Sequence, residues 1–196
     1  CCCSRWPGGW HARASDHAGS VQVLPAFRIL TPLEVAQVRG GAVVIDVLRA
    51  FTVTAWAFHL GAERIVLLRE LDEALRLKAA SPGSFAHCRP LLCTGFATAR
   101  ATAAYLRART DIDWHFVPTG DAGLAVEDIA CAQYIQALIT DAATPSQPFI
   151  ERARGSRAAR DLGTAARDGH AGVDRGDVER CLEADRFDFV MRADLE

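Results

Sequence analysis

The sequence predicts an α/β fold of three layers, in which helices cover both faces of a mostly parallel or mixed sheet. Two observations carry this prediction. Strand-like and helix-like segments alternate along the middle of the chain, and residues 42–48 are apolar almost throughout. A strand that is buried on both faces has a nearly continuous apolar run, and alternating strands and helices are typical of parallel sheets with helical crossovers.

The alternating segments run from residue 42 to residue 142. Strands are expected at residues 42–48, 64–68, 90–93 and 113–117, and helices at residues 50–60, 70–80, 97–107 and 127–142. Gly61 ends the first helix, and a Ser-Pro-Gly turn at residues 81–83 ends the second. The helix at residues 127–142 has the clearest apolar stripe, because its apolar residues recur at three- and four-residue spacing.

Shorter elements are expected beyond Pro145, where the chain is rich in Arg, Ala and Asp. Helices are predicted at residues 148–154, 157–162 and 178–184, a loop at residues 163–175, and a final strand or packed tail at residues 187–191. Residues 1–24 lack periodicity, so we expect a disordered or non-native extension there. Residues 25–196 then form a single domain.

Composition argues against two classes of partner. The net charge of -2, from 22 basic and 24 acidic residues, gives no strong field for nucleic acid or an anionic membrane. No apolar run approaches the ~20 residues that cross a bilayer, because Asp46 and Arg49 interrupt the most hydrophobic stretch. The first residues lack a signal-peptide pattern, so we expect a cytoplasmic protein with reduced cysteines that binds a small molecule. Cys181 is expected to fill the core, and assembly into identical copies is left open.

Asp46 and Arg49 come at the end of the first predicted core strand. Ligands of open α/β sheets bind beyond the carboxyl ends of the strands, which is where these two side chains are expected. A carboxylate in an apolar segment is costly to bury unless a partner compensates its charge. A metal ion can be that partner, and a structural ion pair between Asp46 and Arg49 is the alternative.

A second candidate site follows the strand expected at residues 113–117. Thr119 and Gly120 form a loop before a helix whose first turn carries Glu127 and Asp128. Backbone N–H groups at the start of a helix favour a phosphate, and paired carboxylates favour a hard cation such as Mg²⁺. Capping of the helix by the two carboxylates is the alternative explanation.

Other reactive residue types have plainer explanations. Cys88 and Cys93 have a Cys-x4-Cys spacing but no second pair of ligands to complete a zinc site. Cys131 would need a neighbouring base to act as a nucleophile, and the sequence places none beside it. His59 and His115 lie in hydrophobic segments and are expected to be packed or surface side chains. The chain has no P-loop, no G-x-G-x-x-G and no G-x-S-x-G motif.

Three stretches together resemble the 2-phosphosulfolactate phosphatase family. Residues 43–52 (VVIDVLRAFT) with residues 61–65 (GAERI) are similar to the family's D-V-L-R-A-[TF]-[TS] and G-A-x-x-I signature. Residues 95–102 (GFATARAT) resemble the start of a later helix, and residues 127–132 (EDIACA) resemble an E-D-x-x-C-A motif. The tail from residue 148 to residue 189 is also similar, so the resemblance spans residues 38–192 in the family's order.

The resemblance implies Mg²⁺-dependent hydrolysis of a phosphate monoester, 2-phosphosulfolactate, to sulfolactate and phosphate, a step toward coenzyme M. A bound Mg²⁺ would neutralise phosphoryl charge and orient an attacking water, and the planar fork of an arginine suits a tetrahedral oxyanion. The residues that the resemblance assigns are Asp46, Glu127 and Asp128 as catalytic, metal-binding carboxylates, Arg49 as catalytic anion clamp, and Thr119 and Gly120 as further substrate contacts.

The chain departs from the family pattern in its centre. Family members carry a longer segment there, including an F-D-L-G-N-S-P loop, whereas residues 81–84 here run almost directly into residues 89–92, and the chain contains no Asn. The sequence therefore predicts an internally truncated domain. Three outcomes are open: a phosphatase with a reduced site, an inactive module that binds small acids, and a fragment that folds poorly.

Overall fold

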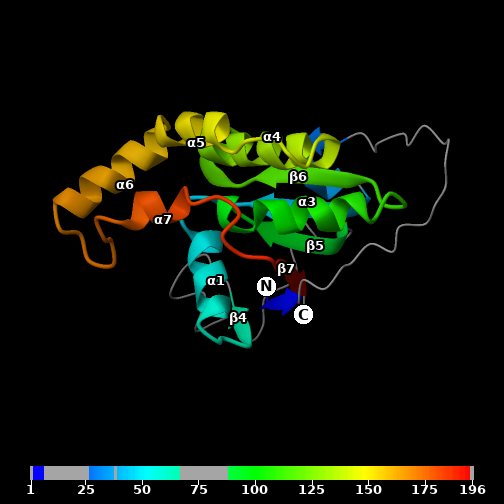
Figure 1. The fold of residues 1–196 in the computed structure, drawn as a ribbon, viewed down its shortest axis with the longest axis horizontal. Helices are drawn as coiled ribbons and strands as arrows, with labels where there is room; N and C mark the ends of the chain where they lie inside the picture. Colours follow the sequence, from blue (N-terminus) through cyan, green and yellow to red (C-terminus); the bar gives the residue numbers. More distant parts are fainter. Residues whose placement is uncertain (1, 7–26, 38, 67–87, 195–196) are drawn as a thin grey trace.

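The computed structural model describes residues 2–6, 27–37, 39–66 and 88–194, which form a seven-stranded mixed sheet with helices packed on it (Figure 1). The strand order is β2-β6-β3-β5-β7-β1-β4. The parallel part of the sheet consists of β2 (Arg28–Ile29), β6 (Trp114–Pro118), β3 (Gly40–Ile45) and β5 (Cys88–Thr94). The antiparallel part adds β7 (Val190–Asp194), β1 (Cys2–Trp6) and β4 (Arg64–Val66). The predicted α/β class with a mixed sheet is confirmed.

Six α-helices occur in the described ranges, and the longer ones follow the predicted positions. They are α1 (Ala50–His59), α3 (Ala99–Arg107), α4 (Val126–Thr140), α5 (Gln147–Arg154), α6 (Arg157–Arg167) and α7 (Asp177–Cys181). Short 3-10 turns are η1 (Val35–Gln37), η2 (Phe96–Thr98) and η3 (Gly120–Gly123). Figure 1 shows α3 and α4 lying along the strands, whereas α6 and α7 project beyond the sheet.

The central strand β3 is buried on both faces, as its apolar run predicts. Val43 and Ile45 belong to the core that packs against α3 and α4. Ala42 and Val44 point to the other face, in the core under α1. Successive side chains of a strand face opposite sides of the sheet, so helices on both faces give the predicted three layers.

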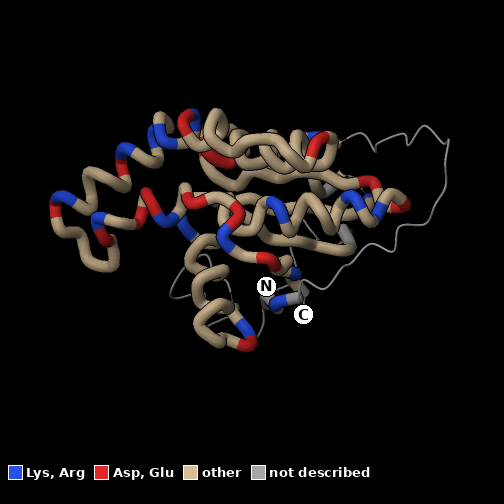
Figure 2. Tube along the Cα trace, in the orientation of Figure 1, with Lys and Arg blue, Asp and Glu red and all other residues tan. Residues whose placement is uncertain are grey.

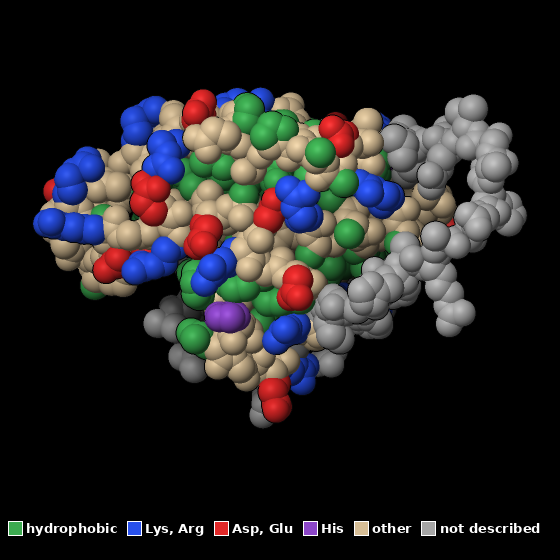
Figure 3. Space-filling view, in the orientation of Figure 1, with side chains coloured by type: hydrophobic (Ala, Val, Ile, Leu, Met, Phe, Trp, Pro, Cys, Tyr) green, Lys and Arg blue, Asp and Glu red, His purple; other side chains and the backbone are tan. Residues whose placement is uncertain are grey.

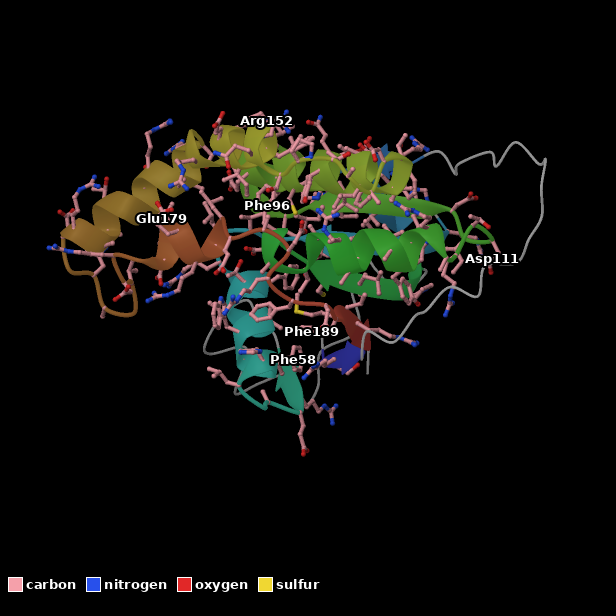
Figure 4. The ribbon with its side chains drawn as sticks, in the orientation of Figure 1. Phe58, Phe96, Asp111, Arg152, Glu179 and Phe189 are labelled. Carbon is pink, nitrogen blue, oxygen red and sulfur yellow. The ribbon has the colours of Figure 1, made fainter. Side chains whose placement is uncertain are left out.

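Aromatic rings fill the core under α1. Phe58 of α1 meets Phe189 edge to face, with ring centroids 6.3 Å apart, and both residues are labelled in Figure 4. Trp56 meets Phe187 in the same manner at 5.2 Å. The segment before β7 therefore packs against α1, and the predicted tail at residues 187–191 becomes a strand only from Val190 onward.

Three predicted boundaries differ from the structure. The first core strand ends at Ile45 rather than at residue 48, because the N–H of Val47 donates to the side chain of Asp128 and not to a neighbouring strand. The loop predicted at residues 163–175 is wrong for its first five residues, since α6 continues to Arg167. The last predicted helix begins at Asp177 and ends at Cys181, earlier than residue 184.

Residues 2–6 form β1, which pairs with β7 on one side and β4 on the other. That part of the predicted N-terminal extension therefore belongs to the sheet, where it fills the position between two antiparallel strands. Figure 1 places the two ends of the chain close together, as the pairing of β1 with β7 requires. The remainder of the extension, at residues 7–24, and the helix predicted at residues 70–80 lie outside the described residues.

Charged side chains are mixed over the visible surface. Basic and acidic residues alternate along α5, α6 and α7 (Figure 2), and both signs are interspersed on the face shown in Figure 3. Ion pairs such as Arg154 with Glu179 and Arg157 with Asp161 account for this pattern, although exposed pairs contribute little stability. In the described part of the chain, every helix is too short or too polar to cross a membrane.

The glycine pair at the start of β3 leads to a prediction about packing. A Cβ on Gly41 would lie 2.4 Å from the ring of Trp114, a fully buried side chain of β6. We expect Gly41→Ala to lower the free energy of unfolding by ~1–3 kcal/mol, because the ring has no space to move. Urea denaturation followed by circular dichroism measures this change in the free energy of unfolding.

Gly163→Ala is the matched control for that substitution. Gly163 lies inside the exposed helix α6, where an added Cβ would meet only the flexible end of Arg167 at 3.6 Å. Alanine should be neutral or stabilise by ~0.5–1 kcal/mol at this position, because glycine is a poor helix former. Equal effects of the two substitutions would contradict the packing argument.

Candidate functional site

The carboxyl ends of three parallel strands are joined by hydrogen bonds at one edge of the sheet. After β3, the N–H of Asp46 donates to the carbonyl of Thr94 at the end of β5, with a distance of 3.3 Å. After β6, both the N–H and the hydroxyl of Thr119 donate to the carbonyl of Ile45, each at 3.1 Å. The two loops that the sequence singled out therefore lie against each other.

Asp128, at the start of α4, ties these loops together. Its Oδ1 accepts a hydrogen bond from the N–H of Val47 at 2.9 Å, and its Oδ2 accepts one from the N–H of Gly120 at 3.0 Å. The side chain is 2% exposed. Asp128 thus satisfies backbone groups of two other segments and does not cap its own helix, which has no side-chain cap.

Glu127 is buried beside Asp128 with 5% of its surface exposed. Among the described residues, no hydrogen bond reaches its carboxylate. The loop and the start of α4 pack closely at Gly120. A Cβ on Gly120 would lie 2.7 Å from the Cβ of Ala125 and 3.7 Å from Oε1 of Glu127. A glycine at this point lets the start of α4 come up against the loop.

Asp46 completes the group of carboxylates. Its Oδ1 accepts a hydrogen bond from the N–H of Ala50 at the start of α1, at 3.1 Å. Burial raises the pKa of Asp46 above its ordinary value, and the negative charge of Glu127 adds to this effect. The N–H of Ala50 and the hydroxyl of Thr119 act in the opposite direction. The protein environment therefore disfavours negative charge at Asp46.

Negative charge is disfavoured more strongly at Asp128 than at Asp46. The pKa of Asp128 is raised to about 7, chiefly by burial; the charges of Asp46 and Glu127 add to this rise, and the two backbone hydrogen bonds oppose it. Two acidic neighbours thus disfavour the ionised form of Asp128, and one of them, Glu127, has the same effect on Asp46. Shifts of this kind concentrate at functional sites, because structural positions rarely gather like charges.

Arg49 does not pair with Asp46, so the predicted alternative of a structural ion pair between them is wrong. Its Nη1 donates instead to Oδ2 of Asp177 at 2.5 Å and to the carbonyl of Gly172 at 2.6 Å. Both acceptors come from the α6–α7 connection and the start of α7. That region therefore holds the candidate anion-binding arginine, a contact that no local sequence pattern predicts.

The plainer explanations for the other reactive residues hold where the structure describes them. Cys131 is fully buried, and burial raises the pKa of its thiol well above the ordinary value, which is the reverse of an activated nucleophile. Cys181 is 2% exposed and fills the core, as predicted. His115 is buried with Nε2 3.1 Å from the carbonyl of Arg39, and His59 packs on two aromatic rings. The side chain of Cys88 lies outside the described residues.

The group of carboxylates fits a cation that brings other ligands with it. Within the described ranges, no three His, Cys, Asp or Glu side chains are placed as a ready-made metal centre. Asp128 uses both oxygens for backbone N–H groups, which leaves Asp46 and Glu127 with oxygen atoms to offer. Mg²⁺ commonly binds through one or two carboxylates and completes its shell with water and substrate phosphate.

The fold and the site define an α/β protein whose carboxylates and a nearby arginine gather at the carboxyl edge of parallel strands, the usual place for a small ligand. The family model described as 2-phosphosulpholactate phosphatase matches residues 29–86, which include Asp46 and Arg49. The chain is also similar to a probable 2-phosphosulfolactate phosphatase of Bacillus subtilis (strain 168), at 28% identity over 200 residues, covering 76% of this chain and 85% of the relative.

A second relative, a probable 2-phosphosulfolactate phosphatase of Synechococcus sp. (strain WH7803), is 52% identical over 50 residues, which cover 24% of this chain and 20% of the relative. The chain is thus similar to probable 2-phosphosulfolactate phosphatases over most of its length, and the match to the family model is confined to residues 29–86. The predicted central truncation stays a prediction, because the junction where it is expected lies largely in residues 67–87, outside the described ranges.

The raised pKa of Asp128 gives a prediction that can be measured directly. In magnesium-free buffer, a carbon-13 NMR titration should place the midpoint of its carboxyl group at about 7, whereas exposed Asp174, whose pKa is lowered, should titrate below 3.8. The folded pKa of Asp128 lies above its unfolded value. Its stabilising contribution is therefore complete below about pH 4 and is lost as the pH rises through about 7.

Asp128→Asn tests the same coupling between protonation and folding through the free energy of unfolding. The variant cannot ionise at this position, so its free energy of unfolding should fall less steeply between about pH 4 and 7 than that of the wild type. Urea denaturation across this range measures the two slopes. An Asp128 midpoint below about 5, or identical slopes, would show that burial does not control this carboxyl group.

Proposed function

We propose that this protein is a phosphoric monoester hydrolase that cleaves 2-phosphosulfolactate to sulfolactate and inorganic phosphate with Mg²⁺ as cofactor. The observation that carries the proposal is the pair formed by Asp46 and Glu127. These two carboxylates come from different segments at one edge of the sheet, and the negative charge of Glu127 disfavours the ionised form of Asp46. Similarity to a probable 2-phosphosulfolactate phosphatase supports the choice of substrate, and a place on a route to coenzyme M is part of the proposal.

Asp46 and Glu127 are the residues that would hold Mg²⁺. Both offer the hard oxygen ligands that this cation prefers, and a cation between them would relieve their repulsion. Asp128 is assigned a supporting role, because its two oxygens hold the backbone of Val47 and Gly120. When bound, Mg²⁺ would neutralise part of the negative charge on the phosphoryl group.

Arg49 is assigned to the anionic end of the substrate. A guanidinium group presents several N–H donors in one plane and matches the oxygens of a phosphate or a sulfonate. Thr119 and Gly120 already direct their polar atoms at Ile45 and Asp128, so in this proposal they shape the loop that borders the substrate. The uncapped N–H groups at the start of the 15-residue helix α4 add positive potential to the same edge.

The hydrolysis consumes one water molecule. The oxygen of the water forms a bond to phosphorus, the ester P–O bond breaks, and the leaving oxygen takes up a proton to become the hydroxyl of sulfolactate. Asp46 is the candidate for accepting the proton of the attacking water, because it is only half-buried and would lie beside the cation that orients this water.

Phosphate release from 2-phosphosulfolactate tests the proposal. The wild type should release phosphate with Mg²⁺ present and lose this activity in EDTA. Asp46→Asn should lower kcat/KM by about 100-fold or more, since general-base catalysis contributes ~10²–10⁴-fold. Asp121→Asn is the matched control: Asp121 is an exposed carboxylate of η3 on the adjacent loop, and its loss should change kcat/KM less than about twofold.

Other results of these measurements would point to the alternatives to a working phosphatase. A chain that shows a native near-ultraviolet circular dichroism spectrum and binds the substrate without releasing phosphate is a binding module. A chain with far-ultraviolet but no near-ultraviolet signal is a poorly folding fragment. Equal losses in Asp46→Asn and Asp121→Asn would show that the Asp46 carboxylate has no special part in the reaction.

A further inference from the structure

Arg49 is held by one end of its guanidinium group. Nη1 carries two N–H bonds, and its two acceptors are Oδ2 of Asp177 at 2.5 Å and the carbonyl of Gly172 at 2.6 Å. Nη2 and Nε make no hydrogen bond to any described residue. The contacts therefore fix one corner of the planar group and leave the opposite edge, with three N–H donors, available to a ligand.

The carboxylate that holds Arg49 is itself fixed. Asp177 begins α7, and its side chain is 18% exposed. Oδ2 of Asp177 also accepts a hydrogen bond from the N–H of Asp174 at 3.1 Å, and Arg180 lies 3.6 Å from Oδ1. At the end of α7, Cys181 and Leu182 anchor the helix in the main core, where only 2% and 4% of their surfaces are exposed.

The available edge of Arg49 has the geometry that tetrahedral anions need. Nε and Nη2 form a fork that can donate two parallel hydrogen bonds to two oxygens of one phosphate or sulfonate group. A free arginine side chain loses much rotamer freedom when it binds such a group. A side chain that is already ordered by Asp177 and Gly172 loses less.

We propose that Asp177 is a positioning residue that orders Arg49 for the phosphate or sulfonate group of the substrate. This inference rests on the proposed function, in which Arg49 binds an anion. Asp177 does not touch the substrate and acts through Arg49 alone. The competing effect of Asp177 is electrostatic, because its negative charge reduces the attraction of the site for an anion. The two effects change KM in opposite directions, so the sign of the change decides between them.

Steady-state kinetics with 2-phosphosulfolactate and Mg²⁺ compare the wild type with Asp177→Asn, Arg49→Ala and the double variant. Asp177→Asn should raise KM about tenfold and leave kcat within about threefold, because ordering Arg49 favours ground state and transition state alike. In the Arg49→Ala background the same substitution should have almost no further effect. Asp177→Glu, which keeps the carboxylate, should recover part of the loss.

Asp174→Asn is the matched control. It removes a carboxylate of the same segment that pairs with Arg180 and does not contact Arg49. KM should stay within about twofold of the wild type. Near-ultraviolet circular dichroism of every variant checks that the segment has folded. If Asp177→Asn does not fold, Asp177→Glu carries the test, and a change in KM that persists in the Arg49→Ala background would then overturn the inference.

The outcomes separate this inference from the proposed function. If Arg49→Ala leaves KM unchanged, Arg49 is not the anion clamp. If Arg49→Ala raises KM but Asp177→Asn lowers it, leaves it unchanged or adds independently, Asp177 is not a positioning residue. If the wild type binds 2-phosphosulfolactate without releasing phosphate, calorimetric dissociation constants replace KM, and the same pattern across the variants supports Asp177. A wild type that does not bind the substrate overturns both.

Discussion

The double hydrogen bond of Asp128 is the interaction on which the site depends. One carboxylate holds the N–H of Val47 after β3 and the N–H of Gly120 after β6, and so fixes the two loops and the start of α4 relative to one another. Hydrogen bonds to a charged group contribute about 1.5–3 kcal/mol each, yet burial still raises the pKa of Asp128 to about 7. The fold therefore keeps a carboxylate whose ionised form it disfavours, which is typical of a site selected for chemistry rather than for stability.

Negative charge dominates the centre of this site, and that sets the order of binding. Asp46, Glu127 and Asp128 lie together, whereas Arg49 points its Nη1 toward Asp177. A phosphate ester that approached these carboxylates alone would be repelled. A cation would reverse the local potential, and this is the physical reason why Mg²⁺ is a necessary part of the proposed function. In the proposed function, Arg49 would then bind an anionic group at the periphery of the site.

Local patterns of the sequence predict the central elements well, because β3, α1, α3 and α4 each carry their own periodicity or their own end signals. The gathering of Asp46, Glu127 and Asp128 also follows from the sequence, since loops after parallel strands meet at one edge. The contact between Arg49 and Asp177 joins residues 128 positions apart and leaves no local signal. The strand β1 is missed for the same reason, because its partners β4 and β7 lie far along the chain.

The C-terminal part of the chain holds both ends of α1. Asp177 binds Arg49 immediately before the helix, and Phe187 packs against Trp56 and His59 near its end. The N–H of Phe187 also donates to the carbonyl of Ala97 at 2.9 Å, which links this segment to the turn that begins α3. The orientation of α1 relative to the sheet therefore depends on residues that follow α6. Because Asp46 accepts a hydrogen bond from the first N–H of α1, any shift of the C-terminal segment would be transmitted to the carboxylates.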